Sequence, residues 1–208
     1  MDRKEHWESV YRTKQPTEVS WYQDRADLSA RIIGEVVPDH SSPIIDVGGG
    51  ASVLASQLDA AGYTKLTVLD LSRAALAAAK ATLGPRASKV HWIEVDILEA
   101  KLPLGGYRFW HDRAVFHFLT TVETRSAYVR QVHHALVPGG YVLMATFAEG
   151  GPRRCSGLDV VRYSPTALQA ALGPGLVFVA AHRNEHRTPS GAAQAFLYCL
   201  FRREDSTR

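Results

Sequence analysis

Short apolar runs alternate with helical periodicities along most of this chain. Runs rich in β-branched residues predict strands at 43–47, 66–69, 90–95, 107–111, 141–145, 176–181 and 195–201. Apolar residues at helical spacing predict helices over 53–61, 73–83, 124–136 and 165–172. Alternation of this kind is typical of a parallel sheet covered by helices, so the pattern predicts an α/β fold.

Residues that begin and end helices support these boundaries. Ser72 is a good N-cap for the alanine-rich helix 73–83, and Gly84-Pro85 terminates that helix. Pro138-Gly139-Gly140 predicts a turn that leads into the strand 141–145. Without an internal repeat or a linker, the pattern predicts one domain over 1–208, with a helical cap at 1–39 and the core at 40–208.

The predicted cap is rich in aromatic residues. Trp7, Tyr11, Trp21 and Tyr22 lie within it, and two short helices are expected there. The segment could simply cover an edge of the sheet. However, ligands of open α/β sheets bind at the carboxyl ends of the strands, and an aromatic segment is well suited to closing such a crevice.

Composition excludes several classes of protein. Hydrophobic residues make up 46% and charged residues 22%, with a net charge of +3, which is too mild to favour nucleic acid or an acidic membrane as a partner. No run approaches the ~20 apolar residues of a membrane span, and the charged N-terminus does not resemble a signal peptide. Two distant cysteines do not indicate a disulfide framework. We expect a cytoplasmic protein, monomeric or homodimeric.

A glycine turn follows the first predicted strand and is the strongest chemical signal. Gly48, Gly49 and Gly50 let the backbone approach a ligand closely, as in dinucleotide-binding folds. The third glycine of the dinucleotide fingerprint is missing, because Val53 stands in its place. Asp46 would repel a pyrophosphate, but it suits a ligand with an ammonium and a sulfonium. The turn therefore favours S-adenosylmethionine over NAD.

Two further acids stand at the ends of successive predicted strands. Asp70 follows the second strand and could accept both hydroxyls of a ribose, and Asp96 follows the third and could accept from the adenine amino group. Leu71 and Ile97 could then hold the adenine ring between them. Any one of these acids could be a helix cap or a solvated loop residue, but together with the glycine turn they predict a cofactor site.

The residues quoted so far resemble the class I S-adenosylmethionine-dependent methyltransferases over nearly the whole chain. Segments 6–11, 18–22, 110–118 (WHDRAVFHF) and 186–189 are also similar to those of a bacterial subgroup of small methyltransferases. The resemblance implies a doubly wound, Rossmann-like sheet of seven strands in the order 3-2-1-4-5-7-6, with the last strand antiparallel. It also implies that Trp21 and its neighbours cover the cofactor.

The segment after the fourth strand is where this fold usually places the methyl acceptor. His117 is the first candidate for a general base and His111 the second, because a histidine with a pKa near neutrality suits proton removal. Asp112 could orient a histidine or contact the cofactor, and Arg113 could pair with Asp112 or attract an anionic acceptor. Alternatively, Asp112 and Arg113 form a structural ion pair, and His117 is a core residue.

The loop 150–157 reads as a lid over the acceptor pocket, although its arginines could equally be solvated. Cys155 in this loop could be a pocket residue, Cys199 is expected in the core, and no metal site is expected. The absence of an (Asn/Asp)-Pro-Pro-(Tyr/Phe) motif argues against a nucleic-acid methyltransferase.

The leading hypothesis is methyl transfer to a small molecule, with a thiol or other sulfur nucleophile slightly favoured. The alternative is a protein lysine N-methyltransferase. A cofactor-binding protein without catalysis and a dehydrogenase are weaker readings. The sequence leaves the acceptor itself open.

Overall fold

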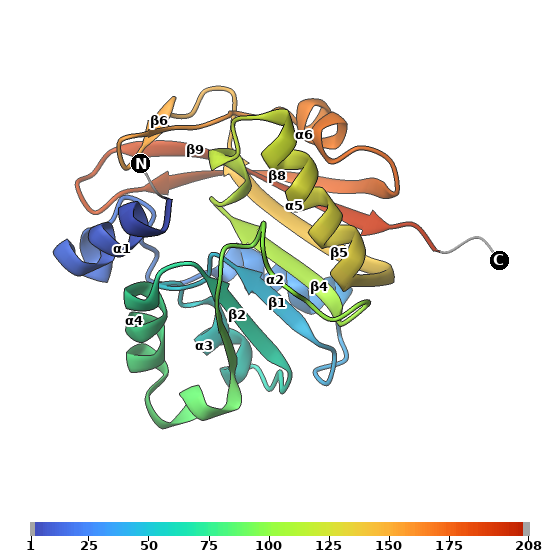
Figure 1. The fold of residues 1–208 in the computed structure, drawn as a ribbon, viewed down its shortest axis with the longest axis horizontal. Coiled ribbons are helices and arrows are strands. Elements are labelled where there is room, and N and C mark those ends of the chain that lie inside the picture. The colour runs from blue at the N-terminus through green and yellow to red at the C-terminus, as the bar shows by residue number, and fades with distance from the viewer. Residues whose placement is uncertain (1–2, 206–208) are drawn as a thin grey trace.

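A computed structural model of the protein describes residues 3–205 (Figure 1). The ends of the predicted domain, 1–2 and 206–208, lie outside the described residues. The central sheet has seven strands in the order β3-β2-β1-β4-β5-β9-β8. Its strands are β1 (Ile44–Val47), β2 (Leu66–Asp70), β3 (His91–Glu94), β4 (Tyr107–Arg113), β5 (Leu136–Phe147), β8 (Leu176–Arg187) and β9 (Ala193–Arg203).

Pairing within the sheet is parallel from β3 to β5, whereas β9 is antiparallel to both β5 and β8. This arrangement confirms the predicted strand order and the reversed last strand. The carboxyl ends of β1, β2, β3 and β4 consequently meet at one edge, which brings the residues after each of these strands together.

Helices cover both faces of the sheet (Figure 1). They are α2 (Asp27–Val36), α3 (Leu54–Ala60), α4 (Arg73–Leu83), α5 (Val122–Ala135) and α6 (Pro165–Leu172). One apolar cluster joins α5 and α6 to the sheet, and a second joins α2, α3 and α4 to its other face. The Ser72 hydroxyl accepts from the backbone N–H of Ala75, as expected of the N-cap of α4.

Three local features differ from the predicted pattern. The chain enters β5 at Leu136, so Gly139, at a φ of 69°, lies in an irregular start of that strand rather than in a turn before it. Strand β8 continues to Arg187, well beyond the predicted end at 181, because it pairs along the full length of β9. The lid loop contains a hairpin of β6 (Arg154–Cys155) and β7 (Leu158–Asp159).

The N-terminal segment contains α1 (Arg3–Thr13) and the 3₁₀ turn η1 (Pro16–Glu18), and further 3₁₀ turns are η2 (Gly84–Lys89) and η3 (Phe116–Phe118). Helix α1 lies beside the start of α4 (Figure 1), where Glu8 accepts hydrogen bonds from the Ser72 hydroxyl and the Ala74 N–H. Among the helices in the described range, none has the length and apolar character that crossing a bilayer requires.

Candidate functional site

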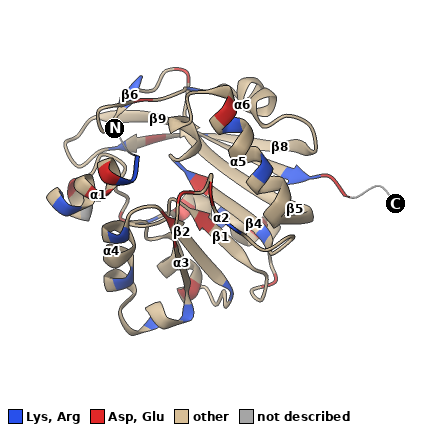
Figure 2. Ribbon diagram, viewed as in Figure 1, with Lys and Arg blue, Asp and Glu red and all other residues tan. Residues whose placement is uncertain are grey.

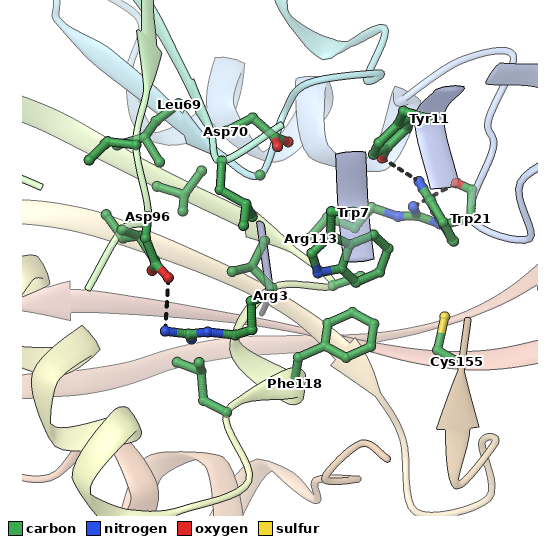
Figure 3. A pocket seen from close by; sticks show the side chains of 18 residues that line it. Arg3, Trp7, Tyr11, Trp21, Leu69, Asp70, Asp96, Arg113, Phe118 and Cys155 are labelled. Carbon is green, nitrogen blue, oxygen red and sulfur yellow. Dashed lines mark hydrogen bonds and ion pairs between the residues drawn. The ribbon is translucent and has the colours of Figure 1, made fainter. Parts of the chain in front are cut away.

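A cleft at the carboxyl ends of the strands contains about 790 Å³ of empty space, part of it open to solvent (Figure 3). It is lined by Arg3, Trp7, Tyr11, Trp21, Val47, Gly48, Leu69, Asp70, Leu71, Val95, Asp96, Ile97, Arg113, Ala114, Val115, Phe118, Leu119 and Cys155. A neighbouring cavity of about 450 Å³ shares Tyr11, Trp21, Gly48 and Arg113 with the cleft. Most of the residues predicted for the cofactor therefore border one continuous space.

The glycine turn forms the floor of this space, and each of its glycines is sterically required. Gly48 has a φ of 70°, which disfavours any side chain, and a Cβ there would lie 2.1 Å from Val115 Cγ2. A Cβ on Gly49 would lie 2.3 Å from an oxygen of Asp46, and one on Gly50 would lie 2.6 Å from an oxygen of Asp70. The turn thus packs directly against two of the predicted acids.

Asp46 belongs to a buried hydrogen-bonded chain. Its Oδ1 lies 2.6 Å from Nδ1 of His111, and Nε2 of His111 lies 2.9 Å from the hydroxyl of Ser29 on α2. The second oxygen of Asp46, Oδ2, is buried without a hydrogen-bond partner. Because both ring nitrogens of His111 are engaged, this residue positions Asp46 rather than offering a free base. Its predicted place among the catalytic histidines is not supported by this geometry.

Asp70 at the end of β2 fastens the glycine turn. Its Oδ2 accepts from the Gly50 N–H at 3.0 Å, and its Oδ1 accepts from the Ser72 N–H at 2.8 Å. Burial raises the pKa of Asp70 to about 6, and these backbone hydrogen bonds partly oppose the rise. Each carboxylate oxygen still has a lone pair available to a further donor such as a ribose hydroxyl.

Asp96 lies across the cleft from Asp70 and binds a cation from the N-terminal helix. Its Oδ2 lies 2.8 Å from the Arg3 guanidinium, and its Oδ1 accepts from the Leu98 N–H at 2.9 Å (Figure 3). Leu71 and Ile97 both line the cleft, as expected for an adenine site. Figure 2 shows acidic residues gathered where the central strands end. The acidic end of the cleft is therefore closed by α1.

Aromatic side chains wall the middle of the cleft. Trp7 packs edge-to-face against Trp21 at 5.5 Å and against Phe118 at 5.0 Å between ring centroids. The Trp21 Nε1–H donates to the Tyr11 hydroxyl at 3.1 Å. The sequence predicts that Trp21 covers the cofactor and that the aromatic segment with Trp7 and Tyr11 closes the crevice, whereas it assigns Phe118 no role. The spacing of four residues between Trp7 and Tyr11 puts both on one face of a helix, which indicates that they contact the same surface.

Arg113, at the end of β4, borders both cavities. Its Nε–H donates to the Tyr198 hydroxyl at 3.0 Å and its Nη1 donates to the Trp21 carbonyl at 2.9 Å. It forms no ion pair with Asp112, contrary to one alternative considered for the sequence. Ala114 follows with a φ of 68°, a left-handed conformation that is uncommon outside glycine and that turns the chain sharply at the cleft wall.

Two predicted catalytic residues do not face the cleft. Asp112 is fully buried and accepts from the N–H groups of Val115 and Phe116 and from the Tyr128 hydroxyl, so it holds the turn after β4. His117 is also fully buried, and its Nδ1 accepts from the Phe147 N–H at 3.3 Å. Burial, helped by the nearby positive charge of Arg113, lowers the pKa of His117 to about 3. Neither residue lines either cavity, which contradicts the base role predicted for His117.

The arrangement fits S-adenosylmethionine on two structural grounds. The partnerless, buried Oδ2 of Asp46 can accept from an ammonium group, and the glycine turn leaves a cradle that any Cβ would fill. A glycine-lined floor with acids at three strand ends matches a ligand that carries an ammonium, a sulfonium and a ribose. The cofactor would thus extend from Asp96 past Asp70 to Asp46.

Comparison with known proteins agrees with this geometry. Residues 44–140, just under half of the chain, match the family model described as a methyltransferase domain. No curated protein sequence gives a significant match. Over these residues the chain is therefore similar to a methyltransferase domain.

Solved structures share the fold at low sequence identity. One was described for the conversion of a disulfide bond into a thioacetal group during echinomycin biosynthesis, with a TM-score of 0.79, 19% identity and coverage of 99% of this chain and 94% of the other. The Burkholderia thailandensis 1,6-didemethyltoxoflavin-N1-methyltransferase has a TM-score of 0.73, 17% identity and coverage of 97% and 87%. The N-methyltransferase NodS from Bradyrhizobium japonicum WM9, complexed with S-adenosylhomocysteine, has a TM-score of 0.72, 17% identity and coverage of 97% and 99%.

Proposed function

We propose that this protein transfers a methyl group from S-adenosylmethionine to a sulfur atom, most simply a thiol, of a small molecule. The single observation that carries the choice of acceptor is the cleft itself. Aromatic side chains and Arg113 line the part of the cleft that lies away from Asp96 (Figure 3), and the lid hairpin contributes Cys155 to its wall. A space enclosed in this way suits a small planar or apolar acceptor.

Each cofactor residue has a proposed role. Asp46 accepts from the ammonium group through its free Oδ2, and Asp70 accepts the ribose hydroxyls. Asp96 accepts from the adenine amino group, and Leu71 and Ile97 pack against the adenine ring. The backbone of Gly48, Gly49 and Gly50 contacts the methionine portion, and Trp21 covers it from the N-terminal side.

When bound, S-adenosylmethionine supplies a methyl group on a positively charged sulfur. The chain's own task is to place an acceptor sulfur in line with that methyl and to exclude water. Trp7, which packs edge-to-face against both Trp21 and Phe118, forms the dry wall together with them. Two structural neighbours also support a small acceptor. One is named for N-methylation of 1,6-didemethyltoxoflavin, and the other is described for conversion of a disulfide bond into a thioacetal group.

Two finer assignments belong to the same proposal. The chain is taken as one domain in which 1–39 forms the cap, since α1 contributes Arg3, Trp7 and Tyr11 to the cleft. We also propose that the protein belongs with the small bacterial methyltransferases that the segment 110–118 and its companions resemble.

Radiolabelled S-adenosylmethionine tests the proposal. The purified protein is incubated with panels of thiols, phenols and small amines, and separately with cell lysate. Label in an extractable methyl thioether supports the proposal, whereas label confined to a protein band would favour lysine methylation instead. Labelled amine or phenol products without any thioether would refute the choice of sulfur while leaving the enzyme class intact.

A further inference from the structure

The guanidinium of Arg113 has one nitrogen without a hydrogen-bond acceptor. Its Nε and Nη1 bind the Tyr198 hydroxyl and the Trp21 carbonyl, and its Cζ lies 4.5 Å from the centroid of the Phe196 ring. These three contacts fix the plane of the group. Nη2 is buried and has no partner. A buried donor in this state costs about 1–3 kcal/mol unless a ligand supplies the acceptor.

The positive charge of Arg113 is also not neutralised locally. Within residues 3–205, no carboxylate forms an ion pair with this arginine, whereas Arg3 at the other end of the cleft is paired with Asp96. The charge of Arg113 acts on neighbouring groups. Burial is the main cause of the lowered pKa values of His117 and His186, and the charge of Arg113 lowers both further. An unpaired cation bordering an aromatic cleft favours an anionic ligand.

Apart from the acids assigned to the cofactor, no described side chain that lines the cleft is suited to removing a proton from the acceptor. The Tyr11 hydroxyl is engaged with Trp21, and burial raises its pKa. Burial also raises the pKa of the Cys155 thiol, whose Sγ lies 3.9 Å from the Ser20 hydroxyl. Of the described residues that line the two cavities, His111 is the one histidine, and both of its nitrogens are engaged. An acceptor that enters already ionised needs no such base.

Building on the proposed function, we infer that Nη2 of Arg113 binds the acceptor as an anion, and that the acceptor class is thiols that ionise readily, above all aromatic thiols. The proton leaves to solvent as the thiolate forms. The thiolate electron pair then makes the new S–CH₃ bond, while the C–S bond of the sulfonium breaks and its electron pair stays on the cofactor sulfur. Both charges disappear in this step, so the atoms and electrons balance without another reactant.

One other anion could occupy the same position, namely the α-carboxylate of the cofactor, because Arg113 borders both cavities. The contacts of its guanidinium favour the acceptor. Tyr198 and Phe196 lie on β9, on the far side of β4 and β5 from the glycine turn after β1. Cys155 of the lid hairpin lies on that side as well (Figure 3). The experiment below separates the two anions.

Binding to the complex with S-adenosylhomocysteine tests the inference without relying on turnover. Calorimetry measures the affinity for 4-nitrothiophenolate and for its neutral methyl thioether. We expect the thiolate to bind roughly 10- to 100-fold more tightly than the thioether, since a hydrogen bond to a charged group has about this effect. Arg113→Gln should remove that preference, so that the thiolate and the thioether bind equally. Arg113→Lys should keep part of it, and Arg183→Gln, which removes the same charge from the exposed surface of β8, should keep all of it.

The cofactor arm uses S-adenosylhomocysteine and 5′-methylthioadenosine, which lacks the amino-acid portion. Arg113→Gln should change the affinity for both compounds by the same factor. A loss of affinity for S-adenosylhomocysteine alone would assign Arg113 to the cofactor carboxylate and overturn the inference. Equal binding of thiolate and thioether by the unaltered protein, or binding of neither, would also overturn it. An Arg113-dependent thiolate preference in a protein that methylates no thiol would support the anion site and refute the proposed function.

Discussion

Adding one methyl group at Gly50 should disrupt the cofactor site more than it disrupts the fold. In Gly50→Ala the new Cβ would lie 2.4 Å from Ala75 Cβ and 2.6 Å from Asp70 Oδ2. Real side chains do not approach this closely, so either α4 or the Asp70 carboxylate must move. The φ of Gly50 is not positive, so the effect comes from contact alone and not from the backbone conformation.

The expected losses of stability and of affinity follow from the groups that must move to make room for the new Cβ. Overpacking costs about 1–3 kcal/mol, and replacing glycine by alanine returns about 0.4–1 kcal/mol through the unfolded chain. The free energy of unfolding should therefore fall by roughly 0–2.5 kcal/mol. Moving Asp70 breaks its hydrogen bond from Gly50 and displaces the proposed ribose ligand. Hydrogen bonds to charged groups contribute about 1.5–3 kcal/mol, which predicts a roughly 10- to 100-fold loss of affinity for S-adenosylhomocysteine.

Calorimetric titration and thermal unfolding measure the two effects separately. Gly34→Ala is the matched control, because the new Cβ, in the last turn of α2, meets nothing within 4 Å and should leave binding unchanged. Gly50→Ala combined with Ala75→Gly should recover only part of the affinity, since the contact with Asp70 remains. Unaltered affinity in Gly50→Ala would refute the reasoning, because Asp70 would then hold its position without the turn that it fastens.

Four further predictions concern single side chains. Affinity for S-adenosylhomocysteine should weaken as the pH falls below about 6, because Asp70 then takes up a proton and loses the charge that attracts ribose hydroxyls. Asp70→Asn should bind weakly at every pH, and a wild-type affinity independent of pH between 5 and 7 (roughly the range around that pKa) would contradict the assignment. His117→Phe should keep kcat within a few-fold in the thiol assay, whereas loss of activity in a folded variant would restore the base role. His111→Phe should lower the melting temperature, because it leaves Asp46 buried without its partner. Cys155 should react slowly with iodoacetamide, and more slowly still when S-adenosylhomocysteine is bound, as followed by mass spectrometry; acceleration by the ligand would contradict its place in the cleft wall.

The strands and the acids at their ends could be read from the sequence, because both depend on local patterns, whereas the order of the strands in the sheet came from the family resemblance. Alternating apolar runs and helical spacing define the sheet, and the position after a parallel strand places a residue at the ligand edge whatever its neighbours are. Asp70 and Asp96 reach the cleft for this reason. The prediction of Ser72 as an N-cap was confirmed on the same local grounds.

The roles of the histidines could not be read in this way, because they depend on contacts between distant segments. His111 faces Asp46 because β1 and β4 pair in register, and Ser29 reaches it from α2. His117 sits in a 3₁₀ turn that rotates it into the interior beside Phe147. A spacing rule that holds for helices or strands gives no direction for a side chain in so short a turn.

The charges along the cleft suggest why an apolar wall would assist this reaction. Acidic residues lie at the cofactor end of the cleft. Arg113 lies beyond the glycine turn and forms no ion pair with a carboxylate of the described residues. When a sulfonium meets a thiolate, two charges present in the ground state vanish on the way to product. A dry site stabilises two separated charges less well than it stabilises their partly neutralised transition state, so exclusion of water by Trp7, Trp21 and Phe118 accelerates the step. With a neutral amine the positive charge merely moves, and the same wall gains much less. The combination of aromatic wall and lone cation therefore favours an anionic sulfur over an amine as the methyl acceptor.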